Sequence, residues 1–391
     1  MGSSAAVVWD PAMLAYDLGG DHPFNPIRLE LTMRLATALG VLDGVEQLKP
    51  EPAAEAEIER IHDVGYVTAV REAPMASWDV GHGLGTADNP VFARMHEASS
   101  LVVGASLLAA ERIASGAATR AINIAGGLHH AMRDHAAGFC VYNDCAVAIS
   151  WLLDHGVERV AYVDVDVHHG DGVQAAFYDD PRVLTISLHQ NPMTLWPGTG
   201  SPMELGGRDA QGTAVNLALP PLTRDAAWLR AFHAVVPSLL GAFRPDVLVT
   251  QCGVDTHTED PLAELSLSVD GHRATYQALR ALAEEHAGGR WLALGGGGYQ
   301  LLRVVPRSWT HLLATVLDRD VAPETALPAE WTSTVRELAP NARLPLSMSD
   351  GEPAGFEPWG GGRAEPVDNA IMDTRNAVFP LHGLDPEDPR D

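Results

Sequence analysis

The sequence predicts a three-layer α/β fold in which helices cover both faces of one parallel sheet. Short β-branched, apolar runs alternate along the chain with longer segments of helical periodicity, and this alternation is typical of βαβ units. Several runs are apolar throughout, which indicates strands that are buried on both faces. Ligands of such sheets bind outside the carboxyl ends of the strands, so we expect the functional site at that edge.

The order of the elements follows from these patterns. The runs expected to form strands are Ala6–Trp9, Ala121–Ala125, Arg159–Val165, Val183–Leu188, Val215–Leu219, Val247–Gln251 and Trp291–Leu294. The helical patterns cover Ile27–Leu39, Ala98–Ala114, Ala146–Asp154, Arg224–Ala242, Gly271–Ala287 and Leu301–Leu317. Residues 1–346 are expected to form one main domain, and residues 347–391, which are rich in Gly, Pro and acidic side chains, an arm that packs partly on it.

The composition narrows the class of protein. The chain has 391 residues, 46% hydrophobic and 20% charged, which is typical of a globular protein. Its net charge of −25 disfavours binding to nucleic acid or anionic membranes, which are themselves negative. We see no membrane-spanning run and no secretory signal, so a cytoplasmic protein is expected. Cys140, Cys145 and Cys252 are expected to be reduced core thiols, because Cys140 and Cys145 have no second pair with which to form a metal site.

The segment Val160–Gly172, VAYVDVDVHHGDG, carries the strongest indication of chemistry. Alternate residues of a strand point to the same face, so Asp164, Asp166 and His168 would share one side of a central strand. Burying three polar side chains is costly, and binding a cation relieves the cost. The alternative is a hydrogen-bonded strand end without a metal.

A further carboxylate, Asp255, follows the expected strand Val247–Gln251 in the motif QCGVDTH. Aspartate in such a place is often only a helix cap, but with Asp166 and His168 it would complete a site of two carboxylates and one imidazole. Catalytic zinc takes three protein ligands and leaves a position for water, while carboxylate-rich sites also suit Fe²⁺ or Mn²⁺. The sequence therefore predicts a single divalent metal site.

Two adjacent histidines, His129 and His130, follow the expected strand Ala121–Ala125. One of them could be a general base and the other an electrostatic or acid partner. Each needs a carboxylate on its far nitrogen to set its tautomer and pKa, and Asp164 and Asp171 are the candidates. The alternative is a pair of surface histidines.

Four consecutive glycines, residues 295–298, precede Tyr299. A phosphate-binding P-loop would need a Lys-Ser or Lys-Thr pair, which this segment lacks. We interpret it as a flexible turn that presents Tyr299, whose hydroxyl can donate to a developing oxyanion. The alternative is an ordinary loop tyrosine.

Taken together, these motifs closely resemble those of the zinc-dependent histone deacetylase family, and most of all the bacterial acetoin-utilization deacetylases of class I. The matching stretches are HPFNPIR from His22, GGLHHA from Gly126, GFCVYND from Gly138, YVDVDVHHGDG from Tyr162, TISLH from Thr185, PGTG from Pro197, QCGVDTH from Gln251 and GGGGY from Gly295. The resemblance implies an arginase-deacetylase fold, with residues 1–346 as the deacetylase catalytic domain.

The resemblance also implies a role for each catalytic motif. His130, backed by Asp171, would be the general base, and His129, backed by Asp164, its cationic partner. Tyr299 would polarise the scissile carbonyl. The residues expected to bind zinc are Asp166, His168 and Asp255.

The same resemblance implies the contacts with substrate and with a structural ion. The carbonyl of Gly138 would accept a hydrogen bond from the substrate amide, and Asp88 would grip the substrate backbone at the rim. Phe139 and Trp196 would form the walls of an acyl-lysine tunnel. Potassium would be bound by Asp164, Asp166, His168, Ser187 and Leu188.

The function implied is hydrolysis of acetyl-lysine side chains in proteins or peptides, which releases lysine and acetate. An acetylpolyamine amidohydrolase with the same chemistry is the alternative. A non-catalytic acetyl-lysine binder is disfavoured because every expected ligand and Tyr299 are present. An arginase-like binuclear site would need a second set of ligands. The oligomeric state stays open.

Overall fold

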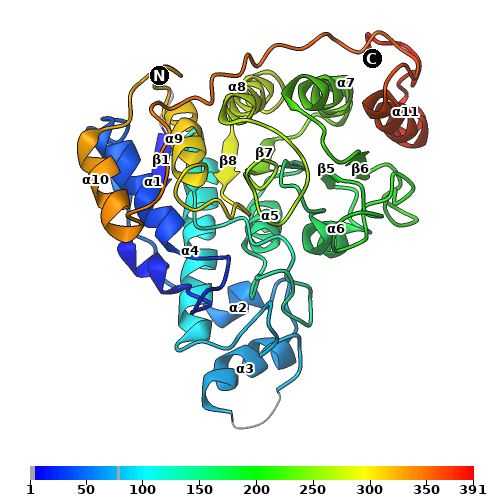
Figure 1. Cartoon of the computed structure of the whole chain (residues 1–391). Helices are drawn as coiled ribbons and strands as arrows, with labels where there is room; N and C mark the ends of the chain where they lie inside the picture. Colours follow the sequence, from blue (N-terminus) through cyan, green and yellow to red (C-terminus); the bar gives the residue numbers. More distant parts are fainter. Residues whose placement is uncertain (1–4, 77–79) are drawn as a thin grey trace.

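The computed structural model describes residues 5–76 and 80–391 and contains one eight-stranded sheet of order β2-β1-β3-β8-β7-β4-β5-β6 (Figure 1). All neighbouring strands are parallel. The strands are β1 Ala5–Val8, β2 Gln47–Leu48, β3 Arg120–Asn123, β4 Val160–Asp164, β5 Val183–Gln190, β6 Ala214–Leu219, β7 Val247–Gln251 and β8 Trp291–Leu294. The predicted parallel sheet is confirmed.

Helices cover both faces of the sheet, as a three-layer fold requires. Helices α7, α8 and α9 pack on one side, and α4, α5 and α6 on the other (Figure 1). The α-helices are α1 Ile27–Ala38, α2 Glu55–Ile58, α3 Val64–Glu72, α4 Met95–Ala114, α5 Asp144–Asp154, α6 Asp171–Phe177, α7 Asp225–Phe243, α8 Val269–His286, α9 Val305–Val316, α10 Ala329–Leu338 and α11 Pro366–Val378. The 3₁₀-helices are η1 Pro11–Ala15, η2 Ala73–Met75 and η3 Phe379–His382.

Each apolar run predicted to form a strand does so, and each predicted helical pattern contains a helix. The pattern from Leu301 becomes helical only at Val305, because Pro306 lacks an N–H and is tolerated only in the first turn of a helix. The two-residue strand β2 and helices α2, α3, α6, α10 and α11 are not predicted. Elements β2, α2 and α6 have only two, four and seven residues, too few to show a clear period. Helix α11 has 13 residues but lies in the segment expected to form an arm.

The strand register aligns polar residues across the sheet at its carboxyl edge. Asp164 of β4 pairs with Ser187 of β5 and with Gln251 of β7. Gln251 pairs in turn with Leu294 of β8, which is level with Asn123 of β3. Four of these five strands therefore end at one level, while β5 continues to Gln190, and the loops that follow carry the polar motifs.

Helix α7 is the one helix of the described residues that is long and apolar enough to cross a membrane. Half of its apolar window is buried in the fold, where it packs against β5, α8 and α11. A core helix passes the same test of length and composition, so the test is weak evidence for a membrane span.

The carboxyl-terminal residues form an arm that contains α11, which packs against α7 and the edge strand β6, and η3, which follows it. A capping box of Glu365 and Asp368 begins this helix. Arg375 is fully buried, lies 4.6 Å from the centre of the Trp359 ring, and donates to the carbonyl of Ala234 in α7. These contacts attach the end of the arm to the main domain.

Candidate active site

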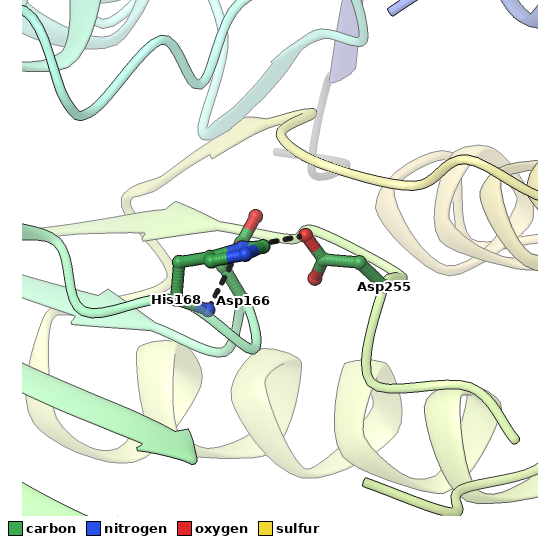
Figure 2. Close-up of side chains that lie close together, drawn as sticks. All are labelled: Asp166, His168 and Asp255. Carbon is green, nitrogen blue, oxygen red and sulfur yellow. Dashed lines mark hydrogen bonds and ion pairs between the residues drawn. The ribbon is translucent and has the colours of Figure 1, made fainter. Parts of the chain in front are cut away.

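The three expected metal ligands converge at the carboxyl ends of β4 and β7 (Figure 2). His168 Nδ1 lies 3.2 Å from Asp166 Oδ1 and 3.2 Å from Asp255 Oδ2, and all three side chains are buried. Strand β4 ends at Asp164, so strand alternation does not account for the placement of Asp166 and His168. The loop after β4 turns both side chains inward, with Asp166 N donating to Asp164 Oδ1 at 3.2 Å.

Fixed donors orient both carboxylates of this cluster. Asp166 Oδ2 accepts hydrogen bonds from Gln251 Nε2 at 2.7 Å and from Gly297 N at 2.8 Å. Asp255 Oδ1 accepts from Val167 N at 2.9 Å. One oxygen of each carboxylate is thereby held by an amide, and the other oxygen faces the imidazole. Such outer partners fix the geometry of metal ligands.

The donor atoms of the cluster suit a bound cation, and their burial shifts their pKa values. Burial, together with the charge of Asp166, raises the pKa of Asp255 to about 8. Burial lowers the pKa of His168, but hydrogen bonds to the two carboxylates outweigh it and raise the value to about 10. Two carboxylates and one imidazole nitrogen that converge in this way fit a single divalent ion such as zinc, ferrous iron or manganese.

His129 and His130 form a second cluster at the same edge. His129 Nδ1 lies 2.7 Å from Asp164 Oδ2, and His130 Nδ1 lies 2.6 Å from Asp171 Oδ1. Their Nε2 atoms face each other at 3.0 Å. Both rings are buried, which excludes a surface pair. The structure thus places each histidine beside the carboxylate expected for it.

The two histidines have opposite pKa shifts. Burial lowers the pKa of His129, but the charges of Asp164 and Asp166 outweigh it and raise the value to about 9. Burial and the nearby charge of His129 lower the pKa of His130 to about 4. At neutral pH, His129 is therefore cationic and His130 is neutral, so His129 Nε2 donates its proton to the lone pair of His130 Nε2.

Tyr299 is held at its backbone by the loop that follows Asp255. Tyr299 N donates to Asp260 Oδ2 at 2.9 Å. Gly296 and Gly298 adopt φ angles of +145° and +142°, a region that favours glycine, and so the chain can turn sharply before the tyrosine. Burial raises the pKa of Tyr299 well above its usual value. Its hydroxyl keeps its proton and can act as a donor.

Phe139 and Trp196 flank the site from different loops. The centre of the Phe139 ring lies 5.7 Å from that of Tyr299, and the centre of the Trp196 ring lies 4.6 Å from that of His130. A Cβ atom on Gly138 would lie 2.4 Å from His130 Cδ2 and 2.6 Å from Trp196 Cη2, so this position requires glycine. Trp196 is 46% exposed, which places it where the site meets solvent.

Asp88 lies beside the phenylalanine wall. Its carbonyl oxygen is 3.2 Å from His22 Nε2, and the His22 ring packs edge-on against Phe139 with centroids 4.6 Å apart. Asp88 itself is exposed. The carbonyl of Gly138, which is expected to face the substrate, accepts a hydrogen bond from Cys140 Sγ at 3.3 Å. The three cysteines are free and buried, as predicted.

The residues expected to bind potassium lie next to the metal ligands. Asp164 and Ser187 are paired across β4 and β5. Ser187 Oγ accepts from Gly170 N at 3.3 Å and is hydrogen-bonded to His189 Nδ1 at 2.9 Å. Leu188 follows Ser187 in β5. Asp164, Asp166 and His168 occupy the adjoining strand end.

Three buried residues that orient the site are not predicted. Gln251 holds Asp166, Tyr162 donates to Asp164 Oδ2 at 2.6 Å, and Asp260 holds the backbone of Tyr299. Gln251 could have been found as a polar residue that closes an apolar strand, and Tyr162 because it shares a strand face with Asp164. No sequence pattern singles out Asp260.

Residues 22–316 match the model of the histone deacetylase domain. The chain belongs to the histone deacetylase family. This deacetylase is 40% identical to the acetoin utilization protein AcuC of Bacillus subtilis (strain 168) over 347 residues. The aligned residues cover 88% of this chain and 89% of that protein. It is 34% identical over 354 residues to AcuC of Staphylococcus xylosus, with 90% and 91% covered.

Solved structures agree with this assignment. The crystal structure of a histone deacetylase homologue from Aquifex aeolicus matches the deacetylase with a TM-score of 0.81 and 28% identity, over 95% of this chain and 100% of that chain. A homologue complexed with SAHA matches with a TM-score of 0.82 and 28% identity, over 96% and 100%. The fold is therefore the arginase-deacetylase fold, and the family implies an acetylated substrate.

Proposed function

We propose that this deacetylase hydrolyses the acetyl-lysine side chains of proteins or peptides with one zinc ion bound by Asp166, His168 and Asp255. The observation that supports this proposal is the position of the ligand cluster beside a neutral and a cationic histidine. The two aromatic rings that flank the site suit the methylenes of an acetyl-lysine side chain. The net charge of −25 favours substrates that carry positive charge outside the uncharged acetyl-lysine side chain.

Different residues of the site would carry out different steps of the hydrolysis. A divalent cation at the ligand cluster would act as a Lewis acid and lower the pKa of the attacking water. His130 would accept the water proton at Nε2, because its Nδ1 is engaged with Asp171, and would exchange its contact with His129 Nε2 for one with the water. Tyr299 donates its hydroxyl to the scissile carbonyl as negative charge develops there. Cationic His129 offsets that charge, and the histidine pair returns a proton to the leaving amine.

We also propose the potassium site of Asp164, Asp166, His168, Ser187 and Leu188. The Asp164 carboxylate, the Ser187 hydroxyl and backbone carbonyls supply the oxygen ligands that a hard cation prefers. An ion there would neutralise part of the carboxylate charge behind the zinc ligands and the histidine pair.

Metal analysis combined with a substrate panel tests this function. We expect one zinc per chain and a higher kcat/KM for acetyl-lysine peptides than for acetylputrescine. The reverse preference would indicate an acetylpolyamine amidohydrolase. Full activity of a metal-free preparation would contradict the proposed metal site.

A further inference from the structure

The carboxyl-terminal arm reaches the loop that carries both Asp255 and Asp260. Beyond the family match, which ends at residue 316, the arm runs past α8 and α7 to α11 (Figure 1). Asp270 Oδ2, in the first turn of α8, accepts hydrogen bonds from Ser349 Oγ at 2.9 Å and from Asp350 N at 3.0 Å. The arm is therefore fixed at residues 349–350, close to the end of β7.

Asp350 contacts three separate elements of the main domain. Its Oδ2 accepts from His257 Nε2 at 2.9 Å and from Val269 N at 2.8 Å, and its Oδ1 accepts from Arg307 at 2.8 Å. Arg307 is almost fully buried and also donates to the carbonyl of Ser349 at 3.0 Å. Charge-assisted hydrogen bonds of this kind are about twice as strong as neutral ones, so these contacts hold Asp350 strongly in place.

His257 connects Asp350 to the loop of residues 255–260, which carries the proposed metal ligand Asp255. Its Nδ1 accepts from Glu259 N at 3.0 Å, so the ring proton lies on Nε2 and is donated to Asp350. The carbonyl of His257 accepts from Asp260 N at 2.9 Å. His257 is two residues from Asp255, and Asp260 holds the backbone of Tyr299. The Asp350 side chain thus supports the segment that carries Asp255, a proposed metal ligand. The same segment carries Asp260, which holds the backbone of Tyr299.

We infer that Asp350 is a positioning residue of the active site, which fixes the 255–260 loop through His257. The inference rests on the proposed metal role of Asp255. It assigns to the arm a part in metal affinity and turnover, although the arm touches neither the ligands nor the aromatic walls. Removing a partner that hydrogen-bonds a metal ligand directly typically costs about 10- to 100-fold in metal affinity or activity, and Asp350 acts one step further out, so we expect a smaller loss.

Zinc affinity of the full chain, measured by competition with a chelator and without substrate, tests this inference. We expect Asp350→Ala to weaken zinc binding about three- to tenfold and to lower kcat with little change in KM. Asp350→Asn should retain part of the affinity, because its amide oxygen can still accept from His257 and Val269 N while its NH2 group cannot accept from Arg307. Asp368→Ala, which removes an ion pair with Arg230 and a cap of α11, is the matched control, and its zinc affinity should equal that of the unmodified chain.

A second variant covers the case in which Asp350→Ala fails to fold. His257→Asn breaks the same contact from the loop side and leaves the contacts of Asp350 with Arg307 and Val269 in place. Its zinc affinity should fall to a similar extent. Unchanged affinity in a folded His257→Asn or Asp350→Ala chain would overturn the inference, as would an equal loss in Asp368→Ala. Failure of the unmodified chain to bind zinc would instead overturn the proposed function.

Discussion

The carboxylates of the active site are paired with histidines differently in its two halves. On the metal side, Asp166 and Asp255 share the imidazole of His168. On the histidine side, Asp164 and Asp171 each have a histidine of their own. The shared arrangement places two carboxylates on one imidazole, a donor set that fits a divalent cation, while in the paired arrangement each carboxylate orients one ring. The pairing of the side chains, and not their chemical type, therefore distinguishes the proposed metal ligands from the proposed proton-transfer groups.

The largest effect is expected on the metal side, from Asp255→Ala. With one of three ligands removed, zinc and activity should be lost together, and kcat/KM should fall at least about a thousandfold. Elemental analysis and a deacetylation assay on the same preparation measure the zinc content and kcat/KM. The control is Asp320→Ala, which changes an exposed residue. Full zinc occupancy in Asp255→Ala would show that this carboxylate is not a ligand.

On the histidine side, activity should separate from metal content. His130→Ala should lower kcat by about 10²- to 10⁴-fold, as is usual when a positioned base is removed, and should retain its zinc. His129→Ala should retain zinc and lose less activity. Paired measurements of kcat and zinc content check this difference. A near-normal kcat in His130→Ala, with an inactive His129→Ala, would reverse the two roles.

The histidine side should also be sensitive to acid through His62, which supports its loop. His62 Nδ1 donates to Met132 O at 2.8 Å, and Nε2 accepts from Asn143 N at 2.9 Å. Burial lowers the pKa of His62 to about 4. Because an unfolded histidine titrates near 6.5, only the unfolded chain gains this proton between pH 6.5 and 4. The stabilisation present above pH 6.5 is therefore lost as the pH falls through that window, by about 3 kcal/mol.

Urea unfolding at several pH values measures this contribution. His62→Asn cannot take up the proton, so its free energy of unfolding should depend less steeply on pH between 6.5 and 4 than that of the unmodified chain. His155→Gln changes an exposed histidine and should keep the original slope. Equal slopes in His62→Asn and the unmodified chain would contradict the prediction.

The smallest effect is expected at Trp196, whose ring contacts His130 and His168 and so touches both halves of the site. Trp196→Ala removes apolar contact area but no catalytic group, so KM for acetyl-lysine peptides should rise about 5- to 10-fold with zinc and kcat retained. Met193→Ala, an exposed residue of the same loop, is the matched control. An unchanged KM would show that Trp196 lies outside the substrate path.

Much of the fold and of the candidate site could be predicted, because the sequence patterns reflect strong physical constraints. A run such as Val247–Gln251 is apolar because it is buried on both faces, and the polar residues that follow it come at a strand end. Parallel strands bring their carboxyl ends to one edge, so Asp255 and His168 could be expected to meet. Helix α11 is not predicted although it has 13 residues. It lies in a segment rich in Gly, Pro and acidic side chains, and it packs against α7 and β6; most helical stability in proteins comes from such packing.

The sequence by itself determined which chemical groups stand at the strand ends: two carboxylates and an imidazole on one side, and adjacent histidines on the other. Only the tertiary structure decided what those groups do. The pKa of about 9 for His129 and about 4 for His130 arises from burial and from the charges around them, chiefly those of Asp164 and Asp166 for His129 and of His129 for His130. The contact of Asp350 with His257 joins residues 93 positions apart. Electrostatic interactions and hydrogen bonds depend on distance in space, and no local pattern in the chain records that distance.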